Sequence, residues 1–250
     1  MIKATDENIK KIVNDGINKY GINADLNYID TSEVTIMSSL FYGSTFNGDI
    51  SLWDTHNVIN MNSLFYGSYF NGDISRWDVS HVVDFNSTFS YSLFDGDISR
   101  WDVSKALYMS YMFSYGFFKQ DISGWDTSNV RDMSFMFYNS AFNGDIGKWD
   151  THNVVIMQCM FAFSSFNQDI SRWDTSNVRD MSLMFNSSPF NQDLRSWHII
   201  KDMNIYLMLF GSDYDKEILW DVDLEKLFGD DYDNYLERWK TALLEEYIIK

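Results

Sequence analysis

The sequence is built on a spacing of 24 residues that holds without insertion through most of its length. Seven tryptophans keep this spacing: Trp53, Trp77, Trp101, Trp125, Trp149, Trp173 and Trp197. Phenylalanine keeps it in two further columns, which begin at Phe41 and Phe46. Such a fixed period is typical of a repeat solenoid, in which each coil stacks on the one before. One coil cannot bury its own rings, so we expect coils stacked ~4.8 Å apart to bury equivalent rings against each other.

Within one coil, from Asp121 to Gly144, the pattern changes along the chain. Apolar and polar residues alternate from Phe118 to Ser123, which predicts a short strand. Asp126 to Asn129 has the composition of a turn. One apolar set then follows at helical spacing and predicts a short helix: Val130, Met133, Met136 and Phe137. The expected fold is therefore an α/β repeat solenoid, with one short strand and one short helix in each coil.

The recurring motif FNxDISxWDTSNVxxMSxMF resembles the BspA-type leucine-rich-repeat surface proteins, over about Leu26 to Phe210. The resemblance implies a leucine-rich-repeat-like solenoid that is often displayed at the cell surface, with adhesion or host-protein binding proposed for some members. It supplies no catalytic residue and no cofactor. The chain shows no signal peptide or anchor. Cell-surface or extracellular localisation thus rests on the resemblance, and a cytoplasmic location is the alternative.

The repeat divides the chain into three parts: an N-terminal helical cap at 1–24, a solenoid of about eight coils at 25–210, and an acidic C-terminal helical cap at 211–250. The first cap carries one apolar helix stripe, and Thr5 or Asp6 is its expected N-cap. That stripe is Ile9, Ile12, Val13, Ile17 and Tyr20.

An amphipathic stripe also marks the C-terminal cap, for which a partner-binding helix is the alternative interpretation. Its residues are Tyr232, Tyr235, Leu236, Trp239, Leu243 and Tyr247.

Charge and cysteine content exclude several classes of protein. The net charge of −17 argues against a nucleic-acid partner and against an anionic membrane surface, because both need an excess of Lys and Arg. No apolar run approaches the ~20 residues of a membrane span, so no membrane insertion is expected. Cys159 is the single cysteine, which rules out a disulfide within the chain.

The polar residues favour structural roles over chemistry. Histidines at 56, 81, 152 and 198 fall in the turn after Trp, where we expect turn residues. His56 and His152 share a column, but they lie four coils apart, too far to share one metal ion. A column of Asp runs from Asp25 to Asp193, and we expect its carboxylates to accept hydrogen bonds from the backbone or from Asn and Ser. A ladder of divalent cations is the alternative. No catalytic motif is present, so we expect no enzyme and no catalytic, cofactor-binding or metal-binding residue.

The sequence therefore favours a non-enzymatic binding scaffold, a monomer with an unidentified protein or glycan partner. A structural or self-assembling solenoid is the alternative, and an exposed coil end would favour it. The candidate contact surface is an aromatic strip made of four residues: Tyr66, Tyr91, Tyr115 and Tyr138. Tyrosine is common in binding surfaces, although these rings could simply shield the coil edges. A cationic strip of Arg76, Arg100 and Arg172 is the competing surface.

Overall fold

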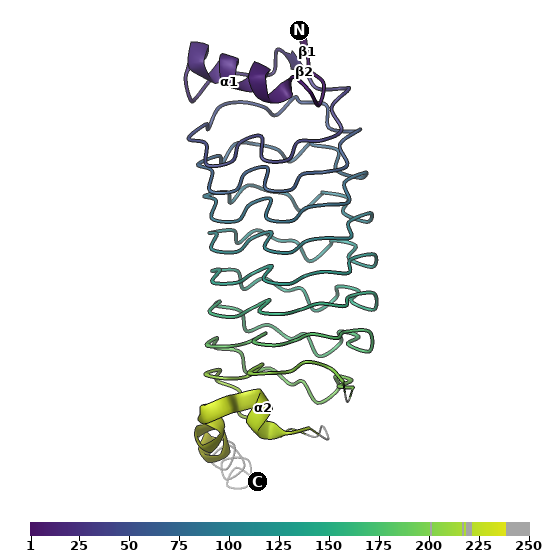
Figure 1. The fold of residues 1–250 in the computed structure, drawn as a ribbon, viewed down its shortest axis with the longest axis vertical. Coiled ribbons are helices and arrows are strands. Elements are labelled where there is room, and N and C mark those ends of the chain that lie inside the picture. The colour runs from purple at the N-terminus through teal and green to yellow at the C-terminus, as the bar shows by residue number, and fades with distance from the viewer. Residues whose placement is uncertain (201, 217, 219–221, 239–250) are drawn as a thin grey trace.

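The computed structural model describes residues 1–200, 202–216, 218 and 222–238. The chain winds through a stack of similar coils, with α1 at one end and α2 at the other (Figure 1). The named elements lie at the two ends: β1 (Ile2–Lys3), α1 (Ile9–Tyr20), β2 (Ile29–Asp30), α2 (Leu224–Phe228) and the short 3-10 helix η1 (Gly229–Asp231). In the described coils between β2 and α2, the backbone forms turns and single bridges instead of further helices or strands.

Parallel single-residue bridges, each one repeat apart, join the coils along one edge. They connect Ile36, Asn60, Asp84, Tyr108, Asp132, Ile156, Asp180 and Asn204 in that order. Beside this column, alternate backbone N–H groups donate to carbonyls of the next coil. Met133 donates to Ile156 over 3.0 Å, and Phe137 donates to Met160 over 3.0 Å. This backbone ladder holds neighbouring coils at a fixed register.

The expected helix in each coil does not form, which corrects the sequence analysis. In the segment from 130 to 137, Asp132 forms a bridge and the chain turns from 134 onward, while the N–H groups of Met133, Phe135 and Phe137 bond to the next coil. Phe135 has φ 57°, and the equivalent residue is left-handed in every coil from Ser39 to Leu207. A left-handed residue interrupts a right-handed helix. The left-handed Phe135 turns the chain so that Met133, Met136 and Phe137 are all buried. Their burial explains why apolar residues recur here at the spacing of a helix.

The expected strand is also absent as a regular element. Burial does alternate there, because Phe118 and Ile122 are buried while Lys119 and Asp121 are exposed. The link to the preceding coil, however, uses a side chain: the Lys119 N–H donates to the Asp95 carboxylate over 2.8 Å. A side-chain oxygen therefore takes the place that a carbonyl would have in a strand pair. The backbone ladder lies on the opposite segment, where the helix had been expected.

The core is a set of aromatic columns that run the length of the stack. Trp125 is 3% exposed, and its ring lies parallel to that of Trp149 at a centroid distance of 6.3 Å. Phe137 stacks on Phe113 and Phe161, each at 5.7 Å. The sequence prediction that equivalent rings pack on each other is confirmed for these columns. Each coil gains its apolar burial from its two neighbours.

At the N-terminal end, β1 pairs in parallel with β2, and α1 buries Ile9 and Val13. The helix begins after Asn8, so the expected N-cap at Thr5 or Asp6 is wrong. Asp6 instead accepts hydrogen bonds from the N–H groups of Thr35 and Ile36, over 2.7 and 3.0 Å.

In the next coil, the equivalent N–H groups, those of Ile59 and Asn60, bond to the carbonyl of Thr35. The Asp6 carboxylate therefore supplies the acceptor that a preceding coil would have supplied.

At the C-terminal end, α2 lies on the last coil. The N–H groups of Leu207 and Leu209 donate to the carbonyls of Lys226 and Leu227. Leu227 and Phe228 are buried. Residues 232–238 are helical, and within them Tyr235 is buried. The remainder of the predicted stripe, Trp239, Leu243 and Tyr247, lies outside the described residues.

Candidate functional site: the aromatic strip

The structure brings the four residues of the aromatic strip together on successive coils. Tyr91 and Tyr115 stack in parallel, with centroids 4.1 Å apart and 12° between their planes. Tyr66 lies 5.5 Å from Tyr91 at 49°, and Tyr138 lies 5.2 Å from Tyr115 at 59°. These rings remain accessible, since Tyr91 is 48% exposed. The strip is thus one continuous surface of phenol rings.

Two more rings extend the strip, and together the six form what we call the ring row: Tyr42, Tyr66, Tyr91, Tyr115, Tyr138 and Phe163. Each of six successive coils contributes one ring. The rings come from two adjacent sequence columns, and whenever one column holds an aromatic residue the other holds a small or polar one. The first column is Tyr42, Tyr66, Ser90, Ser114, Tyr138 and Ala162, and the second is Gly43, Gly67, Tyr91, Tyr115, Asn139 and Phe163.

The tilt between neighbouring rings depends on whether the ring changes column. Where both rings come from the same column, the planes are nearly parallel, as in Tyr42–Tyr66 at 5°. Where the column changes, the planes open to 49° at Tyr66–Tyr91, 59° at Tyr115–Tyr138 and 71° at Tyr138–Phe163. Each change of column therefore produces a wedge between two rings.

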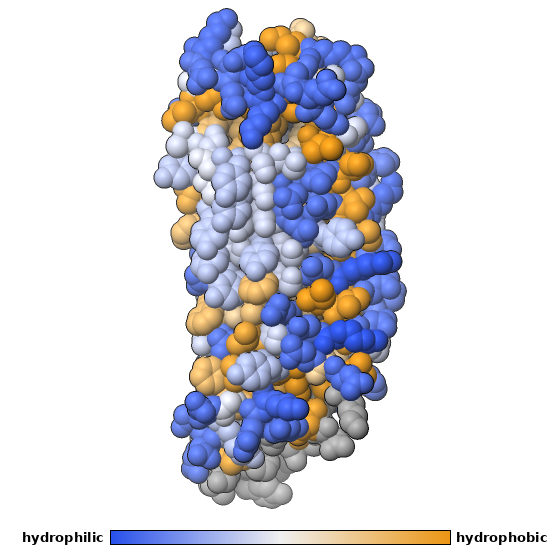
Figure 2. All heavy atoms as spheres, in the orientation of Figure 1, coloured by the Kyte–Doolittle hydropathy of each residue, from blue (hydrophilic) through white to orange (hydrophobic). Residues whose placement is uncertain are grey.

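The strip surrounds a shallow hollow of about 410 Å³. Its lining residues are Tyr66, Ser87, Ser90, Tyr91, Tyr111, Tyr115, Phe135 and Tyr138. On the face shown in Figure 2, pale spheres of intermediate hydropathy run along the coils, in the shade that Tyr and Ser take on this scale. The lining consists of rings and hydroxyl groups, and it carries no charged side chain.

Tyr111 and Phe135 also line the hollow, although the sequence pattern did not place them in the site. Their rings stack at 4.4 Å, and Phe135 also contacts Tyr138 at 5.6 Å. Both occupy the left-handed position of their coils. The sequence does contain a signal for this pair. In the column that holds Ser87, the next two coils have aromatic residues in place of Ser.

The pKa is raised for three phenols of the hollow, those of Tyr91, Tyr111 and Tyr138, which therefore stay protonated at neutral pH. Desolvation, and then the hydrogen bond with Tyr115, raises the pKa of Tyr91 to about 12. Burial and then nearby acidic groups, including Asp132, raise the pKa of Tyr111. The hollow thus offers neutral rings and hydroxyl donors, with the Asp132 carboxylate close enough to act on Tyr111.

The cationic strip lies beside the Asp column, as its sequence position suggested. Arg76, Arg100 and Arg172 are exposed. After the backbone hydrogen bond from Ser75, the charge of Arg76 contributes to a lowered pKa of Asp73. The structure therefore separates two surfaces, one aromatic and one of mixed charge.

The carboxylates of the Asp column accept backbone hydrogen bonds from the residue two positions on. Asp121 accepts from the Ser123 N–H over 2.9 Å, and this bond lowers the pKa of Asp121. The same contact recurs at Asp49, Asp73, Asp97, Asp145, Asp169 and Asp193. The expected hydrogen-bonding role of this column is thus confirmed.

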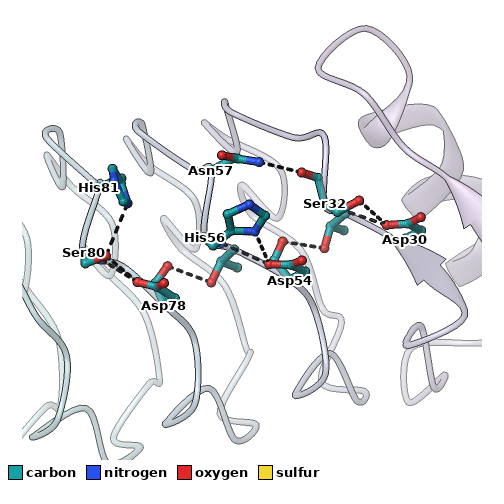
Figure 3. Close-up of polar contacts among 10 residues, drawn as sticks. Asp30, Ser32, Asp54, His56, Asn57, Asp78, Ser80 and His81 are labelled. Atoms are coloured by element: carbon teal, nitrogen blue, oxygen red, sulfur yellow. Dashed lines mark hydrogen bonds and ion pairs between the residues drawn. The ribbon is translucent and has the colours of Figure 1, made fainter.

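The turn after Trp holds a second set of polar contacts, drawn in Figure 3. His56 points its Nδ1 at the Asp54 carboxylate over 2.6 Å, and Ser80 donates to Asp78 over 2.6 Å. Within the part of the chain that the structure describes, no three His, Cys, Asp or Glu side chains are placed to hold a metal ion. Burial raises the pKa of Cys159 to about 11, so its thiol stays protonated. These groups stabilise the turns and the core.

Comparisons with known proteins place the chain in a family. No curated protein and no solved structure matches it. Of the helices in the described residues, none has the length and apolar character needed to cross a membrane. A family model described as "Mycoplasma protein of unknown function, DUF285" matches residues 8–117 and again 115–219. The two consecutive matches cover most of the sequence, and the chain belongs to the DUF285 family of repeat proteins.

Proposed function

We propose that the chain is a non-enzymatic binding scaffold, an adhesion or protein-interaction module whose contact surface is the aromatic strip. The observation that carries this proposal is the ring row. Six coils each place one ring on the same surface, although the ring comes from different columns. Half-exposed rings such as Tyr91 and Phe163 gain little from burial, whereas accessible aromatic surface is typical of interaction sites.

The proposal also covers the type of repeat and the location of the protein. We infer that the coil stack is a leucine-rich-repeat-like solenoid of the BspA type, displayed at the cell surface or outside the cell. The 24-residue repeat and the single parallel bridges support this classification. The coils differ from a leucine-rich repeat with a helix on its outer side, because left-handed turns occupy that position here.

The self-assembly alternative receives less support. It requires a coil whose backbone and apolar face are open to a second copy. At the N-terminal end, Asp6 satisfies the first N–H groups, and at the C-terminal end, α2 supplies the carbonyls that the last coil requires. Both ends are therefore covered in the described residues, which favours a monomeric binder.

The proposal can be tested by incubating the full chain with a peptide array and with a glycan array. We expect ligands on at least one array that are lost when Tyr66, Tyr91, Tyr115 and Tyr138 are all changed to Ser. The matched control changes Arg76, Arg100 and Arg172 to Ser and should keep those ligands. A cooperative thermal melt must be retained by both variants. Ligands that survive the Tyr changes but not the Arg changes would move the site to the cationic strip.

A further inference from the structure

Building on the proposed function, we propose that the aromatic strip receives a basic segment of a partner polypeptide in the polyproline II conformation. The proposal rests on the spacing of the two wedges within the strip, on the lack of free backbone N–H groups in the strip, and on the charge around it. Each of these properties favours such a segment over other occupants.

The two wedges within the aromatic strip lie two coils apart, and the third wedge of the ring row, Tyr138–Phe163, follows on the next coil. Of the two in the strip, one lies between Tyr66 and Tyr91, and the other lies between Tyr115 and Tyr138, with the parallel pair Tyr91–Tyr115 between them. Two coils at ~4.8 Å each separate the wedges by ~9.6 Å. A polyproline II helix presents the same face every third residue, which is ~9.3 Å. An extended strand repeats its face at ~6.6 Å and does not match this spacing.

The strip has no free backbone N–H group with which to bind a strand. Tyr91 and Tyr115 donate their N–H groups to the carbonyls of Ser114 and Tyr138 in the coil ladder. The N–H groups of Tyr66 and Tyr138 close turns within their own coils. A ligand cannot therefore add to the strip by β-pairing. A polyproline II segment needs no such pairing, because its backbone stays hydrated and aromatic grooves recognise its side chains.

The charge around the strip favours a cationic ligand. The chain has a net charge of −17, and the lining of the hollow carries no charged side chain that would repel a cation. The carboxylate of Asp132 lies close enough to raise the pKa of Tyr111, after the larger effect of burial. Ring faces attract guanidinium and ammonium groups. A wedge between two tilted rings gives such a group a ring face to contact.

A glycan fits this surface less well. Sugar rings stack on open aromatic faces, but the parallel pairs Tyr42–Tyr66 and Tyr91–Tyr115 bury their facing surfaces against each other. The hollow supplies hydroxyl groups, and it lacks the charged or amide side chains that bind sugar hydroxyls in pairs. A polypeptide with cationic side chains is therefore the occupant that the geometry favours.

The test uses the full chain and three fluorescent peptides of equal length, each three repeats of Arg-Pro-Pro, Glu-Pro-Pro or Arg-Gly-Gly. Fluorescence anisotropy should show saturable binding of the Arg-Pro-Pro peptide, weakened by added salt. We expect the Glu-Pro-Pro and Arg-Gly-Gly peptides to bind at least about tenfold more weakly. Equal binding of the Arg-Gly-Gly peptide would overturn the polyproline II conformation, and equal binding of the Glu-Pro-Pro peptide would overturn the requirement for cations.

Variants locate the contact. Tyr115→Ser should weaken binding of the Arg-Pro-Pro peptide by about tenfold, and Tyr115→Phe, which keeps the ring, should retain most of it. Tyr206→Ser is the matched control, since Tyr206 is exposed but lies outside the ring row. Peptide binding that Tyr115→Ser leaves unchanged would overturn the inference. If the Arg-Pro-Pro peptide does not bind, while the glycan array yields a ligand that is lost when the four Tyr residues are changed to Ser, this inference is wrong and the proposed function stands. If neither array yields a ligand that the four Tyr changes abolish, both proposals are wrong.

Discussion

The indole Nε1 of Trp125 donates a hydrogen bond to the backbone carbonyl of Ile98, 27 residues earlier, over 3.2 Å. The same bond recurs for every Trp of the repeat, from Trp53 to Trp197. Each indole therefore fills the core and also satisfies a buried carbonyl of the preceding coil. The Ile98 carbonyl also accepts the Trp101 N–H over 3.1 Å, so the indole is its second donor and links this turn to the next coil.

We expect Trp125→Ala to lower the free energy of unfolding by ~3–5 kcal/mol, because it removes a buried aromatic side chain. Trp125→Phe keeps much of the volume but removes one of the two donors to the Ile98 carbonyl, and the loss of that hydrogen bond should cost ~0.5–1.5 kcal/mol. Trp197→Ala, near the end of the stack, should cost less than Trp125→Ala. Urea unfolding followed by circular dichroism gives these values. Negligible losses for both Ala variants would contradict the structural role of the Trp column.

Asp6→Ala should destabilise the first coil, because the N–H groups of Thr35 and Ile36 lose their acceptor. We expect a loss of ~1–2 kcal/mol and faster hydrogen exchange at these two amides. Asp15→Ala is the control, since Asp15 makes only an exposed ion pair with Lys11. If exchange at Thr35 and Ile36 is equally slow in both variants, then Asp6 is not a cap.

Acid should destabilise the coil stack. The hydrogen bond from the Ser123 N–H lowers the pKa of Asp121 in the folded chain, and equivalent bonds lower those of Asp73 and Asp97. Because these folded pKa values lie below the ordinary value of ~3.9, their stabilisation is complete above pH ~4 and is lost as the pH falls through the folded values.

Changing Asp73, Asp97 and Asp121 to Asn keeps an acceptor oxygen for the same N–H groups and removes the ionisation. Urea midpoints measured between neutral pH and pH ~3 should therefore fall less steeply for this triple variant than for the unchanged chain. Identical slopes would show that these three carboxylates do not contribute to the pH dependence.

Removal of residues 211–250 should uncover the last coil. The N–H groups of Leu207 and Leu209 would lose the carbonyls of Lys226 and Leu227, and the apolar face under Phe228 would be exposed. We expect oligomers or soluble aggregates in light scattering, with the coil structure retained. The point variant Leu227→Asp should cause a milder form of the same association. A truncated chain that remains monomeric and equally stable would contradict the capping role.

The sequence was sufficient to predict the features that depend on equal spacing. Residues 24 apart must meet in a stack, so the burial of Trp125 and the contact between Phe113 and Phe137 followed from their positions. The proximity of Tyr66 to Tyr91 and of Tyr115 to Tyr138 followed in the same way. Periodicity fixes which residues are neighbours, and those neighbours were correct.

The backbone path within a coil could not be predicted, because left-handed residues imitate helical spacing. Met133, Met136 and Phe137 share a face in a helix, and they also share one when Phe135 turns the chain at φ 57°. The usual signal for such a residue is Gly or Asn, whereas this position holds Ser, Tyr, Phe, Cys or Leu. The inter-coil ladder, which repeats in every coil, supplies the free energy that holds these residues there.

Each type of contact between coils joins residues that are the same number of positions apart at every level, and this determines how the protein can vary in length. Trp side chains reach back 27 residues, Asn side chains of the turn reach back 25, and Thr side chains reach forward 23, at every level where these residue types occur. Loss or gain of 24 residues by recombination between two coils would restore a partner of the same kind for each of these bonds. Copy number could thus change in single genetic steps without a folding defect, and a step within the six coils of the ring row would shorten or lengthen the row by one ring.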